Sequence, residues 1–257
     1  MTKPKALILL ATGTNRDHDI FDALVLAGAE PEIVPLNILK AHQKSWSDYQ
    51  ILALPGGFSY ADALGAGRLL AIDLNSYFQD QLNLFNEKRK AIIGVCNGFQ
   101  ALVKSGILPG QKSVRSTLTF NQCGHFECRW TTIKPISQKC IWTRNIDKLI
   151  ECPVAHGEGN FQCASPNLIN ELAQNEQIAL VYTSPAGQKA AGEYPYNPNG
   201  SVEDIAGMCN EYGNVLGLMP HPENHIHTYQ HPQWTRGEKA NSGLFLFTNG
   251  VAYASQL

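Results

Sequence analysis

The sequence predicts an α/β protein with three layers: a mostly parallel central sheet flanked by helices, with a smaller antiparallel β portion in the C-terminal half. Over the first hundred residues, short apolar runs alternate with helix-like stretches, and from Leu118 onwards the pattern turns to β-like runs and loops. A parallel strand is buried on both faces and is therefore apolar throughout. Its alternation with helices is typical of a helix-covered parallel sheet, which binds ligands beyond the carboxyl ends of its strands.

The N-terminal elements follow in order from these patterns. A continuous apolar strand is expected at 6–11, and a helix at 17–27 with acidic residues at its start, where they favour the positive end of the helix dipole. Further strands are expected at 32–36, 51–54 and 91–95, and helical residues at 69–85 and after Cys96. The loops after the first, third and fourth strands are polar or rich in glycine, and we expect them to meet at one edge of the sheet.

The C-terminal half is expected to contain strands at 126–133, 177–182 and 215–219 and a last helix within 240–254. The segment 184–201 is rich in Pro, Gly and Asn, which predicts a loop. No repeat, linker or low-complexity tract divides the chain. Residues 1–257 are therefore expected to form a single domain.

Composition excludes several classes of function. The net charge of −2 indicates neither a nucleic acid nor an anionic membrane as a partner, and the apolar runs are too short to cross a bilayer. The first apolar run lacks the length and cleavage site of a secretory signal, so we expect a cytoplasmic protein. No phosphate-binding loop or dinucleotide fingerprint occurs, and no cofactor is expected in this chain.

The cysteines predict neither disulfides nor a metal site. Seven cysteines are spread along the chain without the compact spacing of a disulfide scaffold, and most would be free thiols in a reducing compartment. Cys123, His125 and Cys128 have a faint resemblance to a metal site. Because structural zinc sites commonly use ligand pairs such as Cys-x-x-Cys, and none occurs here, no metal is expected.

Cys96 is the first candidate catalytic residue. It ends the apolar run 91–95, is flanked by Gly94 and Gly98, and is followed by a helix-like run. This pattern is typical of a nucleophile elbow, in which a sharp strand-to-helix turn holds a reactive side chain in a cleft and the start of the helix favours the thiolate. The alternative is a buried structural cysteine at the end of a core strand.

A cysteine nucleophile needs a base and a group that orients the base. His221 is the candidate base because it follows the apolar strand 215–219. Residues two apart in an extended segment point the same way, so Glu223, across Pro222, is the candidate for orienting His221. Taken alone, this His-Pro-Glu run is more typical of a surface turn.

Donors for the developing oxyanion are expected in two places. One is the N–H of Asn97, directly after the nucleophile. The second is the loop after the strand 51–54, from either Gly57 or Phe58. The alternative for that loop is a plain tight turn, because Pro-Gly commonly marks turns.

These motifs together resemble those of class I glutamine amidotransferases, which have a flavodoxin-like three-layer fold. The resemblance rests on Gly94 to Gln100, Pro55 to Tyr60 and His221 to Glu223. More narrowly, the chain resembles the glutaminase subunits of phosphoribosylformylglycinamidine synthase along nearly its whole length. The blocks that carry this narrower resemblance are 13–17, 153–159, 197–201, 204–207 and 214–219.

The resemblance implies a division of roles. Cys96 would attack the amide carbon of glutamine, His221, oriented by Glu223, would act as base and then acid, and Gln100 would help to hold the substrate. The ammonia would pass to a purine synthetase large subunit that uses ATP and magnesium, with a small accessory subunit as an open alternative. The segment from His225 to Gly237 departs from the family pattern, and the family's usual glycine and arginine are replaced by Ala61 and Asn224.

The loop that carries His156 and Glu158 has two interpretations. In the family it lies near the active site, and we expect a partner-facing or gating loop. By residue chemistry alone, the two side chains could equally be a second base–carboxylate pair.

Three rival functions compete with this assignment. The chain could be the glutaminase subunit of another amidotransferase or a stand-alone glutaminase, although the purine-type blocks favour the first assignment. It could instead be a redox or stress protein with Cys96 as a sensor thiol, but this leaves His221 and Glu223 unexplained. A non-catalytic scaffold for a synthetase would not need all three residues.

Overall fold

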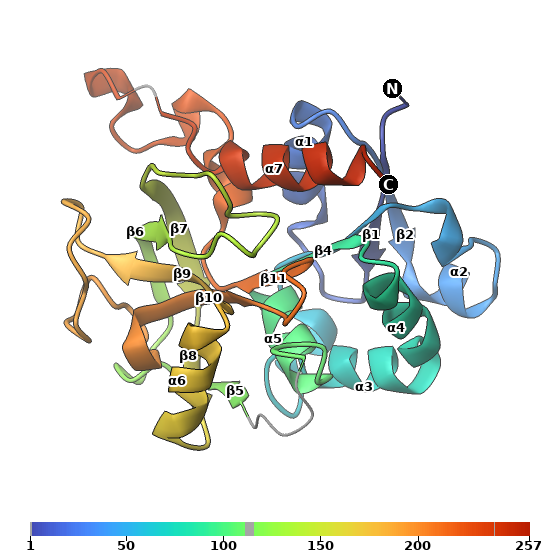
Figure 1. The fold of residues 1–257 in the computed structure, drawn as a ribbon, viewed down its shortest axis with the longest axis horizontal. Coiled ribbons are helices and arrows are strands. Elements are labelled where there is room, and N and C mark those ends of the chain that lie inside the picture. Colours follow the sequence, from blue (N-terminus) through green and yellow to red (C-terminus); the bar gives the residue numbers. More distant parts are fainter. Residues whose placement is uncertain (1, 111–115, 239) are drawn as a thin grey trace.

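The computed structural model describes residues 2–110, 116–238 and 240–257. Within them, nine strands form a central sheet in the order β2-β1-β3-β4-β11-β10-β9-β6-β7, and β5 and β8 pair as a separate two-stranded sheet (Figure 1). The bounds of the strands are β1 Lys5–Leu10, β2 Glu30–Pro35, β3 Ile51–Leu54, β4 Ala91–Val95, β5 Ser116–Thr119, β6 Glu127–Pro135, β7 Ile150–His156, β8 Asn160–Cys163, β9 Ile178–Thr183, β10 Ile205–Cys209 and β11 Val215–Leu218.

The sheet is parallel in one half and antiparallel in the other. Strands β2, β1, β3, β4 and β11 pair in parallel, and the pairings from β11 through β10, β9 and β6 to β7 are antiparallel. The wholly buried β4 lies between β3 and β11. Because these three strands are parallel neighbours, the loops at their carboxyl ends lie side by side.

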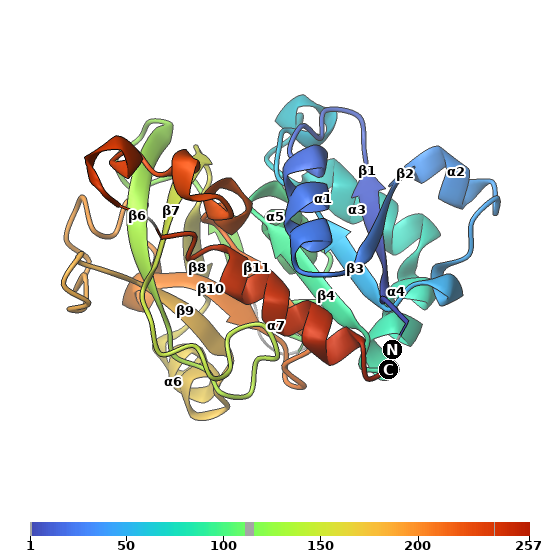
Figure 2. The same cartoon turned by 90° about the horizontal axis from the view of Figure 1, so that it is seen from above.

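Helices cover both faces of the parallel half. α1 and α7 lie over one face, and α3, α4 and α5 lie over the other, which gives the three layers (Figures 1 and 2). The bounds are α1 Asp17–Leu26, α2 Leu36–Lys40, α3 Arg68–Tyr77, α4 Gln79–Glu87, α5 Asn97–Lys104, α6 Pro166–Gln174 and α7 Leu244–Ala254. None of the helices in the described ranges is long and apolar enough to cross a membrane.

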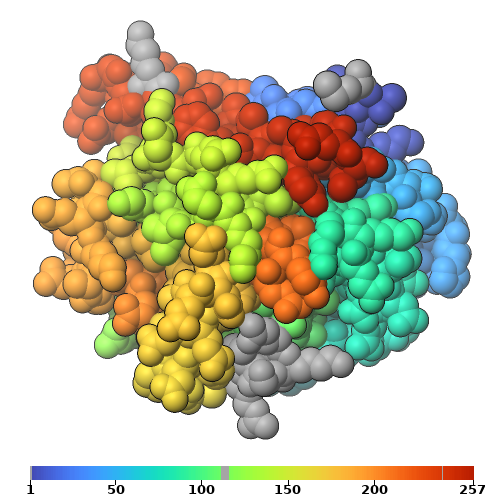
Figure 3. Space-filling model, in the orientation of Figure 1, coloured from blue at the N-terminus to red at the C-terminus, as the bar shows by residue number. Residues whose placement is uncertain are grey.

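The C-terminal helix α7 joins the two halves of the molecule. A Cβ atom on Gly250 would lie 2.0 Å from the ring of the fully buried Trp142, so the helix and the indole are in direct contact. The side-chain amide of Asn249 donates to the carbonyls of Trp142 and Arg144. In the space-filling view, the red surface of α7 accordingly lies beside the yellow-green surface of the 140s segment (Figure 3).

The predicted fold class is confirmed, with differences in detail. The strands at 51–54 and 91–95 have the predicted bounds, and the helical stretch 69–85 divides into α3 and α4 at Phe78. The antiparallel portion is larger than expected, because it continues the main sheet. The sequence patterns missed the strands β5, β7, β8 and β10 and the helix α6, and also the short helix α2 in the N-terminal half. Pro153 lies within β7, where it hides the strand pattern, and it is tolerated because β7 is at the edge of the sheet.

Candidate active site

Cys96 occupies a strained turn between β4 and α5. Its backbone has φ 50° and ψ −104°, a conformation that costs energy for any residue with a side chain. The flanking glycines are required by close packing, since a Cβ on Gly94 would lie 2.6 Å from the Leu102 side chain and one on Gly98 would lie 2.0 Å from the Leu54 carbonyl oxygen. The turn is therefore a nucleophile elbow in geometry, as its sequence predicts.

His221 and Glu223 follow β11, the strand next to β4. The Nδ1 atom of His221 lies 2.7 Å from Oε1 of Glu223, and both side chains are buried. The backbone N–H of His221 donates to the carbonyl of Pro153 in β7, which holds this turn against the antiparallel half. Because Glu223 holds Nδ1, the other ring nitrogen, Nε2, is left to exchange a proton; it is buried and has no hydrogen-bond partner among the described residues.

The electrostatics of this pair favour a protonated imidazole. Burial by itself lowers the pKa of His221, but the interactions of the ring with Glu223, and to a smaller extent with Cys96, outweigh burial and raise this pKa to about 10. Cys96 is thus near enough to His221 to interact with the ring. An imidazolium beside a thiolate is the ion pair that activated cysteine nucleophiles use.

The structure distinguishes between the two candidate oxyanion donors in the loop after β3. The N–H of Phe58 donates to the carbonyl of Gly13 at 3.0 Å, so it is already engaged, whereas no hydrogen bond in the described chain uses the N–H of Gly57. Asn97 is the first residue of α5, and its N–H has no acceptor within the helix. Gly57 and Asn97 are therefore the better-placed pair, and Phe58 is not available in this conformation.

A cavity of about 150 Å³ opens beside Cys96. Gly57 and Phe58 line it from the loop after β3, and His156 and Glu158 line it from the end of β7. The exposed rings of Phe58, Phe120 and Phe126, here called the phenylalanine rim, also border it. Phe58 and Phe126 stack with their ring centroids 6.4 Å apart. The cavity is thus lined by polar side chains and bordered by exposed phenylalanine rings.

A model of the CobB/CobQ-like glutamine amidotransferase domain matches residues 3–254 of this chain. The chain belongs to this family of glutamine amidotransferases. It is 52% identical to phosphoribosylformylglycinamidine synthase subunit PurQ of Treponema denticola, over 98% of this chain and 99% of the relative. PurQ of Dehalococcoides mccartyi is 45% identical over the full length of both chains. A chain in the structure of PurLQS from Thermotoga maritima is similar in fold, with a TM-score of 0.76 and 29% identity over 98% of this chain and 99% of that one.

Gln100 of this amidotransferase lines the cavity but already has protein partners. Its side-chain N–H donates to the backbone carbonyl of Glu158 at 2.8 Å, and its oxygen accepts from the side chain of Asn97 at 3.1 Å. The Asn97 amide also donates to Asp62. Gln100 therefore ties the elbow helix to the loop after β7, and its role in holding glutamine stays a prediction.

His156 is part of the cavity wall and does not face outward. It is 3% exposed, its Nδ1–H donates to the side-chain oxygen of Asn121, and its Nε2 is buried without a hydrogen-bond partner in the described chain. Burial, together with the charge of His221, lowers the pKa of His156 to about 3, so the ring is neutral. A partner-facing role does not suit this side chain. The carboxylate of Glu158 accepts from the backbone N–H of Ala66 and forms an ion pair with Lys104. Because these contacts engage Glu158 away from His156, the two side chains do not form a base–carboxylate pair in this structure.

Sequence patterns missed Asp62 and Asn121. Asp62 lines the cavity, and burial, followed by the charge of Glu158, raises the pKa of its carboxyl group. Asn121 fixes the tautomer of His156 and accepts the N–H of Gly159 through the same oxygen. Neither residue belongs to a recognisable motif, and only the folding of distant loops brings them to the site.

The altered segment after Glu223 folds into short 3-10 turns, η4 Pro222–His225, η5 Thr228–Gln230 and η6 Trp234–Arg236. His225 anchors it, because its ring is fully buried and its two nitrogens face the carbonyls of Glu151 and Ala240. The ring of Trp130 in β6 packs nearly perpendicular to this ring, with the two centroids 5.1 Å apart. The segment therefore packs beside the antiparallel half and contributes no described side chain to the cavity.

Ala61 has an energetically costly backbone. It lies in η2 Ser59–Asp62 with φ 55°, where a Cβ atom costs ~1–2 kcal/mol. Ala61→Gly should therefore stabilise the protein by ~0.5–1 kcal/mol, after the greater freedom of glycine in the unfolded chain is subtracted. Urea unfolding measures the change. The matched control is Ala63→Gly, two residues later, where φ is −54°. This change should destabilise the protein. Equal effects of the two changes on the free energy of unfolding would show that the backbone of Ala61 is not strained.

Proposed function

We propose that this chain is the glutaminase subunit of phosphoribosylformylglycinamidine synthase. It hydrolyses glutamine to glutamate and ammonia, and the ammonia passes to an ATP-dependent synthetase subunit that converts formylglycinamide ribonucleotide to formylglycinamidine ribonucleotide. The observation that carries the proposal is the juxtaposition of Cys96, His221 and Glu223 beside the cavity. The full-length similarity to relatives that bear this subunit's name supports the pathway.

In the proposed reaction, Sγ of Cys96 attacks the side-chain amide carbon of glutamine, and the carbonyl electron pair moves onto the oxygen. The N–H groups of Asn97 and Gly57 stabilise that oxyanion. His221 gives its Nε2 proton to the departing nitrogen, so ammonia leaves and a glutamyl thioester is left on Cys96. A water molecule, deprotonated by His221, then attacks the thioester and releases glutamate.

The cavity suits an amino-acid substrate. The carboxylates of Asp62 and Glu158 place negative charge in its wall, which favours the α-ammonium group of glutamine. Lys104 partly offsets that charge. We assign no cofactor to this chain: ATP and magnesium would act on the synthetase subunit, and glutamine hydrolysis by the three residues needs neither. This enzyme would work in the cytoplasm.

The phenylalanine rim is the proposed contact for the synthetase. Phe120 is 72% exposed at the mouth of the cavity, and Phe58 and Phe126 are about half exposed beside it. Clustered exposed aromatic side chains are typical of protein interfaces. A synthetase that covers this rim would seal the cavity and receive ammonia directly.

Reconstitution with the synthetase tests the proposal. The chain alone should hydrolyse glutamine slowly. The synthetase should raise the rate of hydrolysis by ~10²-fold, which is about the rate factor lost when one oxyanion donor is removed. Phe120→Ser should weaken co-purification with the synthetase, whereas Tyr229→Ser, which changes an aromatic side chain 60% exposed in η5, should not. Fast hydrolysis without the synthetase, or no association with it, would refute the subunit assignment.

A further inference from the structure

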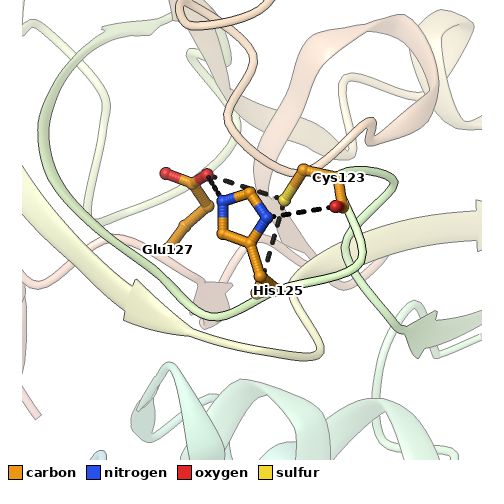
Figure 4. A group of neighbouring side chains, drawn as sticks. All are labelled: Cys123, His125 and Glu127. Atoms are coloured by element: carbon orange, nitrogen blue, oxygen red, sulfur yellow. Dashed lines mark hydrogen bonds and ion pairs between the residues drawn. The ribbon is translucent and has the colours of Figure 1, made fainter.

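A second cluster of reactive side chains lies in the loop before β6 and at its first residue. Figure 4 shows the side chains of Cys123, His125 and Glu127 turned toward one another, with one possible ligand atom from each within 4.8 Å of the others. A turn closed by the N–H of Gly124 on the carbonyl of Asn121, with Gly124 at φ 75°, brings Cys123 beside His125. The proposed glutaminase reaction uses none of the three.

Two of the separations among the three ligand atoms can be compared with those of a tetrahedral zinc site, and the third pair lies within 4.8 Å. Bond lengths of ~2.3 Å to sulfur and ~2.0–2.1 Å to nitrogen and oxygen place sulfur and oxygen ~3.6 Å apart, and nitrogen and oxygen ~3.4 Å apart. Cys123 Sγ lies 3.6 Å from Oε1 of Glu127, and Nε2 of His125 lies 2.9 Å from the same oxygen. An ion between them requires only a small outward shift of the exposed imidazole.

The groups around the cluster already orient the ligand atoms. Nδ1 of His125 lies 3.1 Å from the carbonyl oxygen of Cys123, to which it donates, so Nε2 is the nitrogen that faces the other two groups. Glu127 is 2% exposed and accepts from Nε of Arg129 through Oε2, which leaves Oε1 turned toward Cys123. Metal-binding histidines and carboxylates are typically fixed in this way by hydrogen bonds from their outer atoms.

One member of the cluster, Cys123, borders a cavity of about 290 Å³. Tyr194 also lines this cavity, and its hydroxyl donates to Oε1 of Glu127. The side of the cluster at Cys123 is therefore the one from which a fourth ligand, water or a small molecule, would approach an ion. Sites with three protein ligands and an exchangeable fourth position are the rule for zinc that is not purely structural.

We propose that Cys123, His125 and Glu127 bind a divalent zinc ion with an open fourth position toward this cavity. Thiolate, imidazole and carboxylate together favour zinc over magnesium or calcium, which prefer oxygen ligands alone. Binding replaces the thiol proton of Cys123, which is released to solvent, and no electron is transferred. The sequence expectation of no metal considered Cys128, which is exposed and outside the cluster; the fold supplies Glu127 as the third ligand instead.

An ion at this place would fix a loop that also forms the active-site wall. Asn121 orients His156, and its side-chain amide donates to the carbonyl of His125. Phe126, between two of the ligands, stacks on Phe58 and lines the glutamine cavity. The zinc site therefore holds the loop from Asn121 to Glu127 in the conformation that shapes the substrate cavity.

The experiment uses the purified full-length chain titrated with cobalt(II), as a spectroscopic substitute, and with zinc in competition with a chromophoric chelator. We expect one ion per chain and a thiolate-to-cobalt charge-transfer band. Cys123→Ser should abolish the band. His125→Ala should weaken zinc binding by at least ~10-fold, because changing a residue that only hydrogen-bonds to a zinc ligand already lowers metal affinity by this much. Both residues lie in a surface loop, and circular dichroism verifies that the variants fold.

Two controls locate the ion. Cys128→Ser changes a neighbouring exposed cysteine and should leave the charge-transfer band and the zinc affinity unchanged. Cys96→Ala should also leave both unchanged, because the ion is not bound at Cys96. Absence of binding to the unaltered chain, undiminished binding after Cys123→Ser and His125→Ala, or loss of binding after Cys96→Ala would each overturn the proposal. These readouts do not depend on glutaminase activity, so failure here leaves the proposed function standing.

Discussion

Cys96→Ala should reduce glutamine-dependent synthesis by the reconstituted complex at least ~10⁴-fold, because losing the nucleophile of a catalytic unit costs far more than losing a binding contact. Synthesis supplied with ammonium salt should be unchanged, since ammonia then reaches the synthetase without passing through the thioester. The measurement is the rate of amidine formation with glutamine and with ammonium as alternative nitrogen donors. Cys96 is buried at a strained turn, and alanine fits the same space without adding an atom.

The matched control is Cys128→Ala, which removes an exposed thiol far from the elbow in sequence. It should leave both rates unchanged. If Cys96→Ala abolished the ammonium-dependent rate together with the glutamine-dependent one, Cys96 would hold the complex together and would not be the nucleophile.

Glu223→Gln should lower the glutaminase rate by ~10²–10⁴-fold, because the amide can no longer hold His221 in the required tautomer or stabilise its imidazolium. It should also change the pH dependence. The carboxylate is the main group that raises the pKa of His221 to about 10 against the opposing effect of burial, so removing its charge lowers this pKa. The loss of activity at alkaline pH, where His221 can no longer protonate the departing ammonia, should then move to lower pH.

The measurement is the glutaminase rate of the complex from neutral to alkaline pH. The control is Glu211→Gln, which changes an exposed residue in a turn. If the alkaline limb of the pH profile did not shift in Glu223→Gln, Glu223 would not control the protonation of His221.

The raised pKa of His221 also has a consequence for the stability of the fold. A histidine whose pKa is raised by folding contributes stability that is complete below the pKa of the unfolded chain, ~6.5, and is lost as the pH rises toward the pKa of the folded protein.

The parallel half of the fold and the positions of its candidate catalytic residues follow from local patterns. Local sequence predicts the structure of three segments: the apolar run 91–95, the glycines around Cys96, and the apolar run before His221. Burial on both faces of a parallel strand, and close packing of the backbone at the glycines, allow few residue types at these positions. The relation between Cys96 and His221 is also predictable, since both follow strands whose carboxyl ends share one edge of a parallel sheet.

Long-range contacts set the limit of what the sequence predicts. The choice between Gly57 and Phe58 as the oxyanion donor depends on the carbonyl of Gly13, which lies in a different loop. The inward position of His156 depends on Asn121, and no periodicity marks that pairing. The approach of Cys123 to Glu127 depends on the turn at Gly124, because these residues lie in a loop and at the start of β6, where sequence spacing alone does not predict which side chains meet.

The stack of Phe58 on Phe126 makes the loop after β3 part of the molecular surface. Phe58 directly follows Gly57, the proposed oxyanion donor, and its ring is 44% exposed. A subunit docked on these rings would act directly on the backbone of that donor, and an allosteric signal would not need to cross the core. Whenever docking raises the affinity for glutamine, thermodynamic reciprocity requires glutamine to raise the affinity for the subunit by the same factor. A loaded active site would then recruit its own acceptor for ammonia, and an empty one would release it.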